Sequence, residues 1–246
     1  MSWRAFDPKS AAQDVVASAR EAVGDRVVSA TLYGSAAMGT FHQDRSDVNV
    51  AFVLKALDAE TLQALEPANR VWRKKRVVRP LLLTREILET SLDTFPLEYT
   101  LIRAHHEPLH GPDPFASLVV DRGSLRLQIE RTLRTHSLAL AWSYLDAART
   151  PSGARHWATR AGTAIAASAS GLLHLAGKTI PATRLDLAAM TAATFDVPVG
   201  PLQQVLLPPG ERPPLESAAL FAGASDVVHR LLNAAERLDA TPERIS

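Results

Sequence analysis

Four residues in the first quarter of the chain have types and a spacing that could do phosphate chemistry. Gly34 and Ser35 form a Gly-Ser pair, and Asp47 and Asn49 begin twelve residues after Ser35. A glycine lets the backbone approach a ligand closely, a helix start exposes unpaired N–H groups to an anion, and the serine hydroxyl adds a donor. Carboxylate and amide oxygens are ligands that magnesium accepts. A Gly-Ser pair alone is most often just a turn, so its setting between two strands matters.

Two predicted strands position these residues. The stretch 27–33 has a strand-like pattern that ends just before the Gly-Ser pair, and residues 35–38 are expected to begin a short helix. The apolar run 48–54 predicts the second strand. Because side chains alternate between the two faces of a strand, Asp47 and Asn49 are expected on the same face of the sheet.

At these positions the sequence resembles the nucleotidyltransferase superfamily, which includes polymerase β and kanamycin nucleotidyltransferase. The family signature is Gly-Ser at a turn and helix start, then two acidic residues separated by one residue on the next strand. Gly34, Ser35 and Asp47 match this signature, whereas Asn49 stands where the second acid is expected. The resemblance implies a nucleoside triphosphate (NTP) as ligand and Mg²⁺ held by carboxylates, in which two metal ions serve nucleotidyl transfer.

The third carboxylate of this family comes from a later strand, and the sequence offers none there. Residues 77–83 predict that strand, yet no Asp or Glu occurs between Glu66 and Glu86. Arg79 lies where an acid is expected. Its guanidinium could lie near Asp47, which would suit a salt bridge or anion binding better than metal binding.

Two more distant carboxylates are candidates for completing the site. Phe-Pro-Leu-Glu at 95–98, followed by Leu-His-Gly-Pro-Asp at 109–113, is similar to kanamycin-nucleotidyltransferase-type sequences, in which a last strand, here 99–109, precedes a helical domain. Glu98 could be a displaced carboxylate, or a surface or capping residue. Glu130 could be the general base for an acceptor hydroxyl, or an ordinary charge on a helix surface.

A basic run at residues 70–79 contains six Lys or Arg residues in ten, including Arg73, Arg76 and Arg79. Such a run could contact phosphate or RNA, and Trp72 could stack on a base. The alternative, which we favour, is a solvated helix end with Trp72 in the core.

His105, His106 and His110 are close in sequence and could suggest a metal site. Adjacent residues of a strand point to opposite faces, however, so we do not expect these histidines to bind one metal ion together.

The composition is that of an ordinary soluble globular protein, with 46% hydrophobic and 22% charged residues. The formal net charge of +1 gives no global attraction to nucleic acid or acidic membranes. There are no cysteines, which excludes disulfides, thiolate metal sites and a cysteine nucleophile. Neither a signal-peptide core nor a membrane span is apparent, and we expect a cytoplasmic protein that does not contact membranes.

The predicted fold class is α+β with two domains. Residues 1–122 are expected to form a nucleotidyltransferase-like mixed sheet with flanking helices, and residues 123–246 an all-α helical bundle, because the composition there shifts to Ala- and Leu-rich helix. Small residues in 164–171 should permit close helix packing. The expected bundle helices are 125–145, 154–176, 184–194, 201–207 and 215–238.

Three functions remain open from the sequence. The leading hypothesis is a nucleotidyltransferase-fold pseudoenzyme whose nucleotidyl transfer is weak or lost and which retains a nucleotide or polyphosphate pocket. The first alternative is an active, metal-dependent enzyme that transfers a nucleotide to a small-molecule, RNA or protein hydroxyl. The second is a non-catalytic interaction module. The sequence does not specify the acceptor, the base or the oligomeric state.

Overall fold

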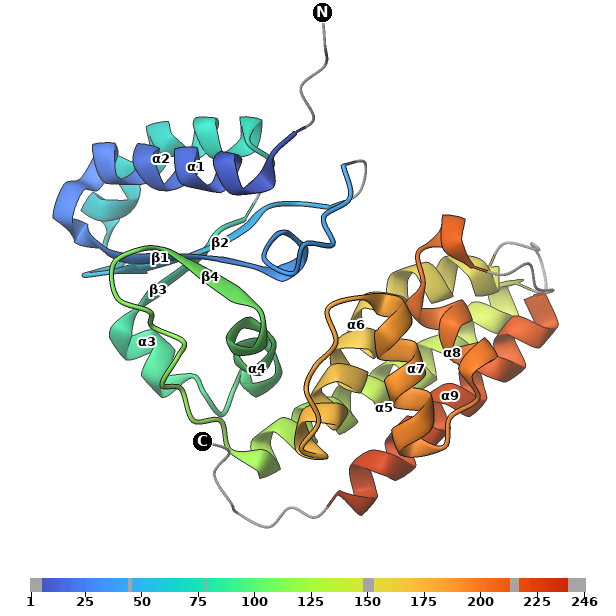
Figure 1. Cartoon of the computed structure of the whole chain (residues 1–246). Coiled ribbons are helices and arrows are strands. Elements are labelled where there is room, and N and C mark those ends of the chain that lie inside the picture. The colour runs from blue at the N-terminus through green and yellow to red at the C-terminus, as the bar shows by residue number, and fades with distance from the viewer. Residues whose placement is uncertain (1–5, 44–45, 78, 148–152, 213–216, 239–246) are drawn as a thin grey trace, which may run out of the picture. The chain divides into compact units, whose positions relative to one another are not determined.

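The structure is a computed structural model that describes residues 6–43, 46–77, 79–147, 153–212 and 217–238 (Figure 1). The chain divides into two compact units. The first contains the chain up to Leu92 together with Ile102–Val119, and the second contains Asp93–Leu101 together with the chain from Val120 onward. A domain boundary between residues 122 and 123 stays a prediction.

The first unit is built on a four-stranded mixed sheet in the order β3-β2-β1-β4. Strand β1 pairs antiparallel with β2 and with β4, and β2 pairs parallel with β3. The mixed sheet and its flanking helices confirm the predicted α+β class. The strands are β1 (Val27–Tyr33), β2 (Asn49–Leu54), β3 (Leu81–Thr84) and β4 (His106–His110).

Helices α1 (Pro8–Val23) and α2 (Ala59–Lys74) pack side by side over one face of this sheet (Figure 1). Each helix starts at an Asp that accepts backbone N–H groups, Asp7 for α1 and Asp58 for α2, as expected for N-capping residues. The core between the helices and the sheet contains the even-numbered residues of β2. These are Val50, Phe52 and Leu54, which pack with Val15, Val16, Ala19, Leu65 and Trp72.

The odd-numbered residues of β2 therefore belong to the opposite face of the sheet, the face on which Asn49 lies. Antiparallel partners share a face, so the partners of Asn49, Ala51 and Val53 on β1 lie there too. These partners are Tyr33, Thr31 and Ser29. We call this the site face.

Two predicted strands differ from the structure. Residues 99–104, predicted as part of a strand, instead belong to helix α4 (Pro96–Ala104), because Pro96 is favourable in a first helical turn and the Thr100 hydroxyl donates to its carbonyl. Strand β3 begins only at Leu81. Before it, Arg76 adopts a left-handed φ of 64° and Pro80 has no N–H for a ladder. Val78 of the predicted strand lies outside the described residues. Helix α3 (Arg85–Thr90) follows β3.

The second unit is helical, as predicted. Helix α6 lies against α5, α7, α8 and α9. A Cβ at Gly171 of α6 would lie 2.7 Å from Ile129 Cδ1 and 2.8 Å from Leu97 Cδ1, so the small side chain permits the close packing that was expected. No described helix is long and apolar enough to cross a membrane. The helices are α5 (Arg122–Ala147), α6 (Gly153–Leu175), α7 (Arg184–Phe195), α8 (Val199–Leu206) and α9 (Ser217–Arg237).

Candidate functional site

Gly34 and Asn49 are in direct contact at the end of the β1–β2 ladder. Tyr33, the last residue of β1, is the register partner of Asn49, the first residue of β2. Gly34 follows with φ +72°, and a Cβ placed on it would lie 2.6 Å from the Asn49 Nδ2 atom. The Asn49 side chain thus occupies the space that a larger residue at position 34 would need. The structure brings these two predicted site residues together.

The predicted helix start at Ser35 is a short 3₁₀ turn rather than an α-helix. It spans Gly34–Ala36, and the chain then turns again, with Met38 N donating to Gly34 O at 3.0 Å and Thr40 N donating to Ser35 O at 2.9 Å. Ser35 is half-buried. The first N–H groups of such a turn have no partner within the turn, so an anion could bind them.

Asp47 precedes β2 and is exposed. Among the residues that the structure describes, no ion pair joins Asp47 to Arg79, although Arg79 is exposed as well. The register of β2 with β3 begins at Ala51 and Leu81, so Arg79 lies before the ladder. The interpretation of Asp47 as a salt-bridge partner of Arg79 is not supported by this geometry.

A row of polar residues crosses the site face next to Gly34. Asn49 on β2, Tyr33 on β1 and His106 on β4 are successive register partners. Burial raises the pKa of the Tyr33 hydroxyl, which keeps Tyr33 neutral at physiological pH. The sequence patterns indicated individual strands but not the order in which they pair. The row formed by Asn49, Tyr33 and His106 was therefore not predicted.

Both ring nitrogens of His106 lie within hydrogen-bond distance of an oxygen atom. Its Nε2 lies 2.8 Å from the Asp113 Oδ2 atom and its Nδ1 lies 3.2 Å from the Arg103 carbonyl oxygen. The ring also packs edge-on against Phe115. Burial acts to raise the pKa of Asp113, but hydrogen bonds from His106 and from backbone N–H groups outweigh it, and the net pKa is lowered. His106 thus connects β4 to Asp113 and Phe115 in the segment that follows the strand.

Thr31 adds a further polar group to the site face. Its side chain is buried, and among the described residues its hydroxyl has no hydrogen-bond partner. It lies two residues before Tyr33 on the same face of β1. A buried hydroxyl without a protein partner is costly, and a bound water or ligand group could satisfy it.

The side chains at the site do not match the donor set of a two-metal nucleotidyl-transfer centre. Asp47 supplies one carboxylate, while Asn49 supplies only an amide and its nitrogen faces Gly34. Within the described ranges, no group of three or more His, Cys, Asp or Glu side chains is placed to hold a metal ion. Asp47 and Asn49 therefore do not reproduce the two carboxylates that the family signature has at these positions.

Glu98 and Glu130 belong to the second unit, whereas the Gly-Ser turn, Asp47 and Asn49 belong to the first. The Glu98 carboxylate accepts a hydrogen bond from Gln128 Nε2 at 2.7 Å. Both of these glutamates thus belong to a different compact unit from the residues with which the sequence grouped them.

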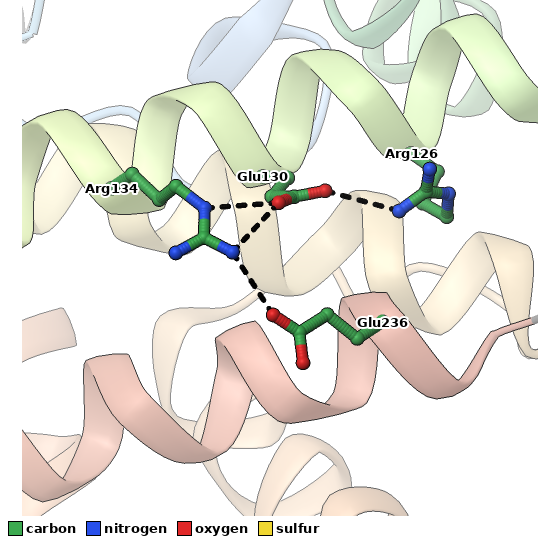
Figure 2. A network of polar contacts seen from close by, with 4 residues as sticks. All are labelled: Arg126, Glu130, Arg134 and Glu236. Atoms are coloured by element: carbon green, nitrogen blue, oxygen red, sulfur yellow. Dashed lines mark hydrogen bonds and ion pairs between the residues drawn. The ribbon is translucent and has the colours of Figure 1, made fainter.

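Glu130 forms part of an ion network between α5 and α9 (Figure 2). One of its oxygens accepts from Arg126 at 3.0 Å and the other from Arg134 at 2.8 Å, and Arg134 also contacts Glu236 at 3.0 Å. The hydrogen bond from Arg134 is the main cause that lowers the pKa of Glu130. A carboxylate with a lowered pKa and both oxygens in ion pairs is a weak general base, so this geometry favours the helix-surface interpretation.

The basic run does not present an aromatic stacking platform. Trp72 is only 3% exposed, stacks on Phe52 and donates its Nε1 hydrogen to Ser18 Oγ at 3.0 Å. The core placement that we favoured is confirmed. Arg73 is exposed, whereas the Arg76 guanidinium lies 5.2 Å from the centre of the Phe6 ring. Arg73 and Arg79 remain exposed anion-contact candidates.

Comparison with known families agrees with this fold. A family model described as Nucleotidyltransferase domain matches residues 16–103, a segment that extends from α1 through strands β1, β2 and β3 into α4 and includes the Gly-Ser turn and Asn49. The chain therefore contains a nucleotidyltransferase domain in its N-terminal part. A comparison with curated proteins gives no significant match.

Proposed function

We propose that this protein binds a nucleotide or another polyphosphate at the Gly34–Ser35 turn and transfers nucleotides weakly or not at all. The observation that carries the proposal is the contact between Asn49 and Gly34, because a neutral amide stands beside the phosphate-binding turn where the family has a carboxylate. Support for binding comes from the turn itself, which combines a positive-φ glycine with a serine hydroxyl.

The absence of two carboxylates weakens the binding of a metal ion more than it weakens the binding of a phosphate. A unit charge about 4 Å from another contributes roughly 4 kcal/mol at an effective dielectric constant of about 20, and twice that for a divalent ion. In this chain Asn49 replaces one carboxylate, and β3 carries no Asp or Glu to supply the other. The metal ion that would activate an acceptor therefore loses the electrostatic attraction of two negative charges. A nucleotide phosphate depends on N–H and hydroxyl donors, which this chain retains. Mg²⁺ bound to the nucleotide's own phosphates could still contact Asp47.

The experiment measures binding and transfer separately. Calorimetric titration of the full chain with each common nucleoside triphosphate and Mg²⁺ should detect binding, and Ser35→Ala should weaken it. Pyrophosphate release with Mg²⁺ or Mn²⁺ should stay at background. Turnover above background that disappears in Asp47→Ala would overturn the loss of transfer, and no binding of any triphosphate, diphosphate or polyphosphate would overturn the retained pocket.

Asn49→Asp tests the role of the missing carboxylate. This nearly isosteric change restores the acidic pair and should raise the Mg²⁺-dependent affinity for a triphosphate by at least about tenfold. Asn69→Asp is the matched control, because Asn69 is a half-buried asparagine on α2, which covers the opposite face of the sheet. An equal gain in both variants would mean that general charge, and not position 49, governs metal binding.

A further inference from the structure

Two arginines of the helical unit approach the same turn of α6. Arg184, the first residue of α7, donates from Nη1 to the Gly162 carbonyl oxygen at 3.2 Å. Arg212, which follows α8, donates from Nη1 to Thr159 Oγ1 at 3.1 Å and from Nε to the Leu207 carbonyl oxygen at 2.7 Å. We call Arg184 and Arg212 the arginine pair.

Gly162 leaves room for both α8 and Arg212. A Cβ built on Gly162 would lie 2.5 Å from the Val205 carbonyl oxygen and 3.9 Å from Arg212 Nη2. Because Arg184 contacts the carbonyl oxygen of the same glycine, Nη1 of Arg184 and Nη2 of Arg212 are no more than about 10 Å apart. Two guanidinium groups at this spacing are within reach of one phosphate group, whose oxygens accept hydrogen bonds from more than one arginine.

The described part of the protein does not neutralise the charges of the arginine pair. Neither guanidinium forms an ion pair with a carboxylate of any residue that the structure describes. Both arginines are half-buried, and burial lowers the pKa of each guanidinium with no described carboxylate opposing it. Arg184 also lies in the first turn of α7, where the positive end of the helix dipole disfavours a cation. Partly buried cations without a counterion are costly, so this arrangement favours the binding of an anion.

The hydrogen bonds of the arginine pair do not replace a counterion. The groups that accept from the two arginines are carbonyl and hydroxyl oxygens, which carry no net charge. A guanidinium has five N–H groups, and toward the described residues Arg184 uses one of them and Arg212 two. A phosphate group carries a charge of about −1.5 to −2 near neutral pH and matches the two positive charges, whereas one carboxylate would neutralise only one arginine.

We propose that Arg184 and Arg212 bind a phosphate group next to Gly162, at a site separate from the Gly34–Ser35 turn. All the residues of this second site belong to the helical unit, whereas the turn belongs to the first unit. The phosphate is either free inorganic phosphate or the phosphate group of a larger molecule, since both present the same dianionic oxygens to the arginine pair. Binding neutralises both guanidinium groups and links the start of α7 and the segment after α8 to α6.

Calorimetric titration of the full chain with inorganic phosphate at constant ionic strength tests the site. We expect a dissociation constant of the order of 1 mM. Arg184→Gln and Arg212→Gln should each weaken binding by at least about tenfold, because each removes one charge-assisted contact. Arg230→Gln is the matched control, since Arg230 is a half-buried arginine of the same unit that already pairs with Asp226 at 2.9 Å. No binding by the wild-type chain, or an unchanged affinity in either folded variant of the arginine pair, would overturn the proposal.

Hydrogen exchange of the full chain locates the phosphate. Phosphate should protect backbone amides in the first turn of α7 and in the segment 207–212, and protection confined to the Gly34–Ala36 turn would overturn the proposal. Acetate at the same ionic strength should give no protection, and protection equal to that by phosphate would overturn the assignment of a phosphate group. Adenosine monophosphate distinguishes the two sources: stronger protection of these amides than by inorganic phosphate supports the phosphate of a nucleotide, and equal or weaker protection supports free phosphate.

Melting temperatures give an independent measurement. Phosphate at about 10 mM should raise the melting temperature of the wild-type chain by about 3–5 °C and should leave that of Arg184→Gln nearly unchanged. Arg184→Lys and Arg212→Lys keep the charge but lose the planar fork of donors, so they should bind phosphate severalfold more weakly even where a glutamine variant does not fold. Circular dichroism confirms that each variant is folded. An equal rise in the wild-type chain and in folded Arg184→Gln would contradict the proposed role of this arginine.

Discussion

Replacing Gly34 by alanine tests the packing at the centre of the candidate site. The new Cβ would meet two separate penalties. The first is conformational, since Gly34 has φ +72°, a region that L-residues with a Cβ rarely adopt. The second is steric, since the Cβ would lie 2.6 Å from Asn49 Nδ2 and the amide would have to move.

The two penalties have different sizes. A left-handed conformation costs a non-glycine residue about 1–2 kcal/mol. Displacing a half-buried asparagine from a tight contact adds about 1 kcal/mol, at the low end of overpacking effects. We therefore expect Gly34→Ala to lower the free energy of unfolding by roughly 2–3 kcal/mol, which corresponds to a decrease in melting temperature of several degrees in a chain of this size.

Gly39→Ala separates the two penalties. Gly39 has the same φ of +72°, and no atom lies within 4 Å of a Cβ built on it, so this variant pays the conformational cost alone. Urea unfolding of both variants should show Gly34→Ala to be less stable than Gly39→Ala by about 1 kcal/mol. This difference should disappear when Asn49→Ala is introduced in both backgrounds. Equal destabilisation by the two glycine variants with Asn49 present would refute the contact on which the site description depends.

Two further predictions concern charged groups away from the Gly-Ser turn. Burial opposes ionisation of Asp113, but contacts with His106 and with backbone N–H groups lower its net pKa, so its contribution to stability is present above the unfolded pKa of about 3.9 and is lost as the pH falls through the lower folded pKa. Asp113→Asn should make the acid side of a melting-temperature series less steep, and an unchanged slope would contradict this assignment. Glu130→Gln should lower the free energy of unfolding by about 1 kcal/mol, because two arginines lose an ionised partner, whereas Glu236→Gln should cost only a few tenths of a kcal/mol because its contact is half exposed. Pyrophosphate release above background by the wild-type chain that disappears in folded Glu130→Gln would show instead that Glu130 is catalytic.

The sequence by itself determined the fold class, and it predicted the central residues of the candidate site. The period-two pattern of residues 48–54 predicted strand β2 and placed Asn49 on one face of the sheet, which the structure shows to be the face opposite Val50, Phe52 and Leu54. The Gly-Ser pair predicted the turn that follows β1. These features are local, so neighbouring residues carry enough information to specify them. The helix at 96–104 was missed, because a short apolar segment has no period long enough to separate helix from strand.

Only the tertiary structure decided which residues meet. The contact of Asn49 with Gly34, and the row that continues through Tyr33 to His106, depend on the order and register of strands that are distant in sequence. The same holds for the ion network of Glu130, in which Arg134 contacts Glu236, 102 positions away on α9. Local sequence patterns determine the side of a strand or helix on which a residue lies, but the pairing between elements determines which residues are its neighbours. The neighbours in turn determine the charge state and pKa of a side chain and the space around it, and therefore its chemistry.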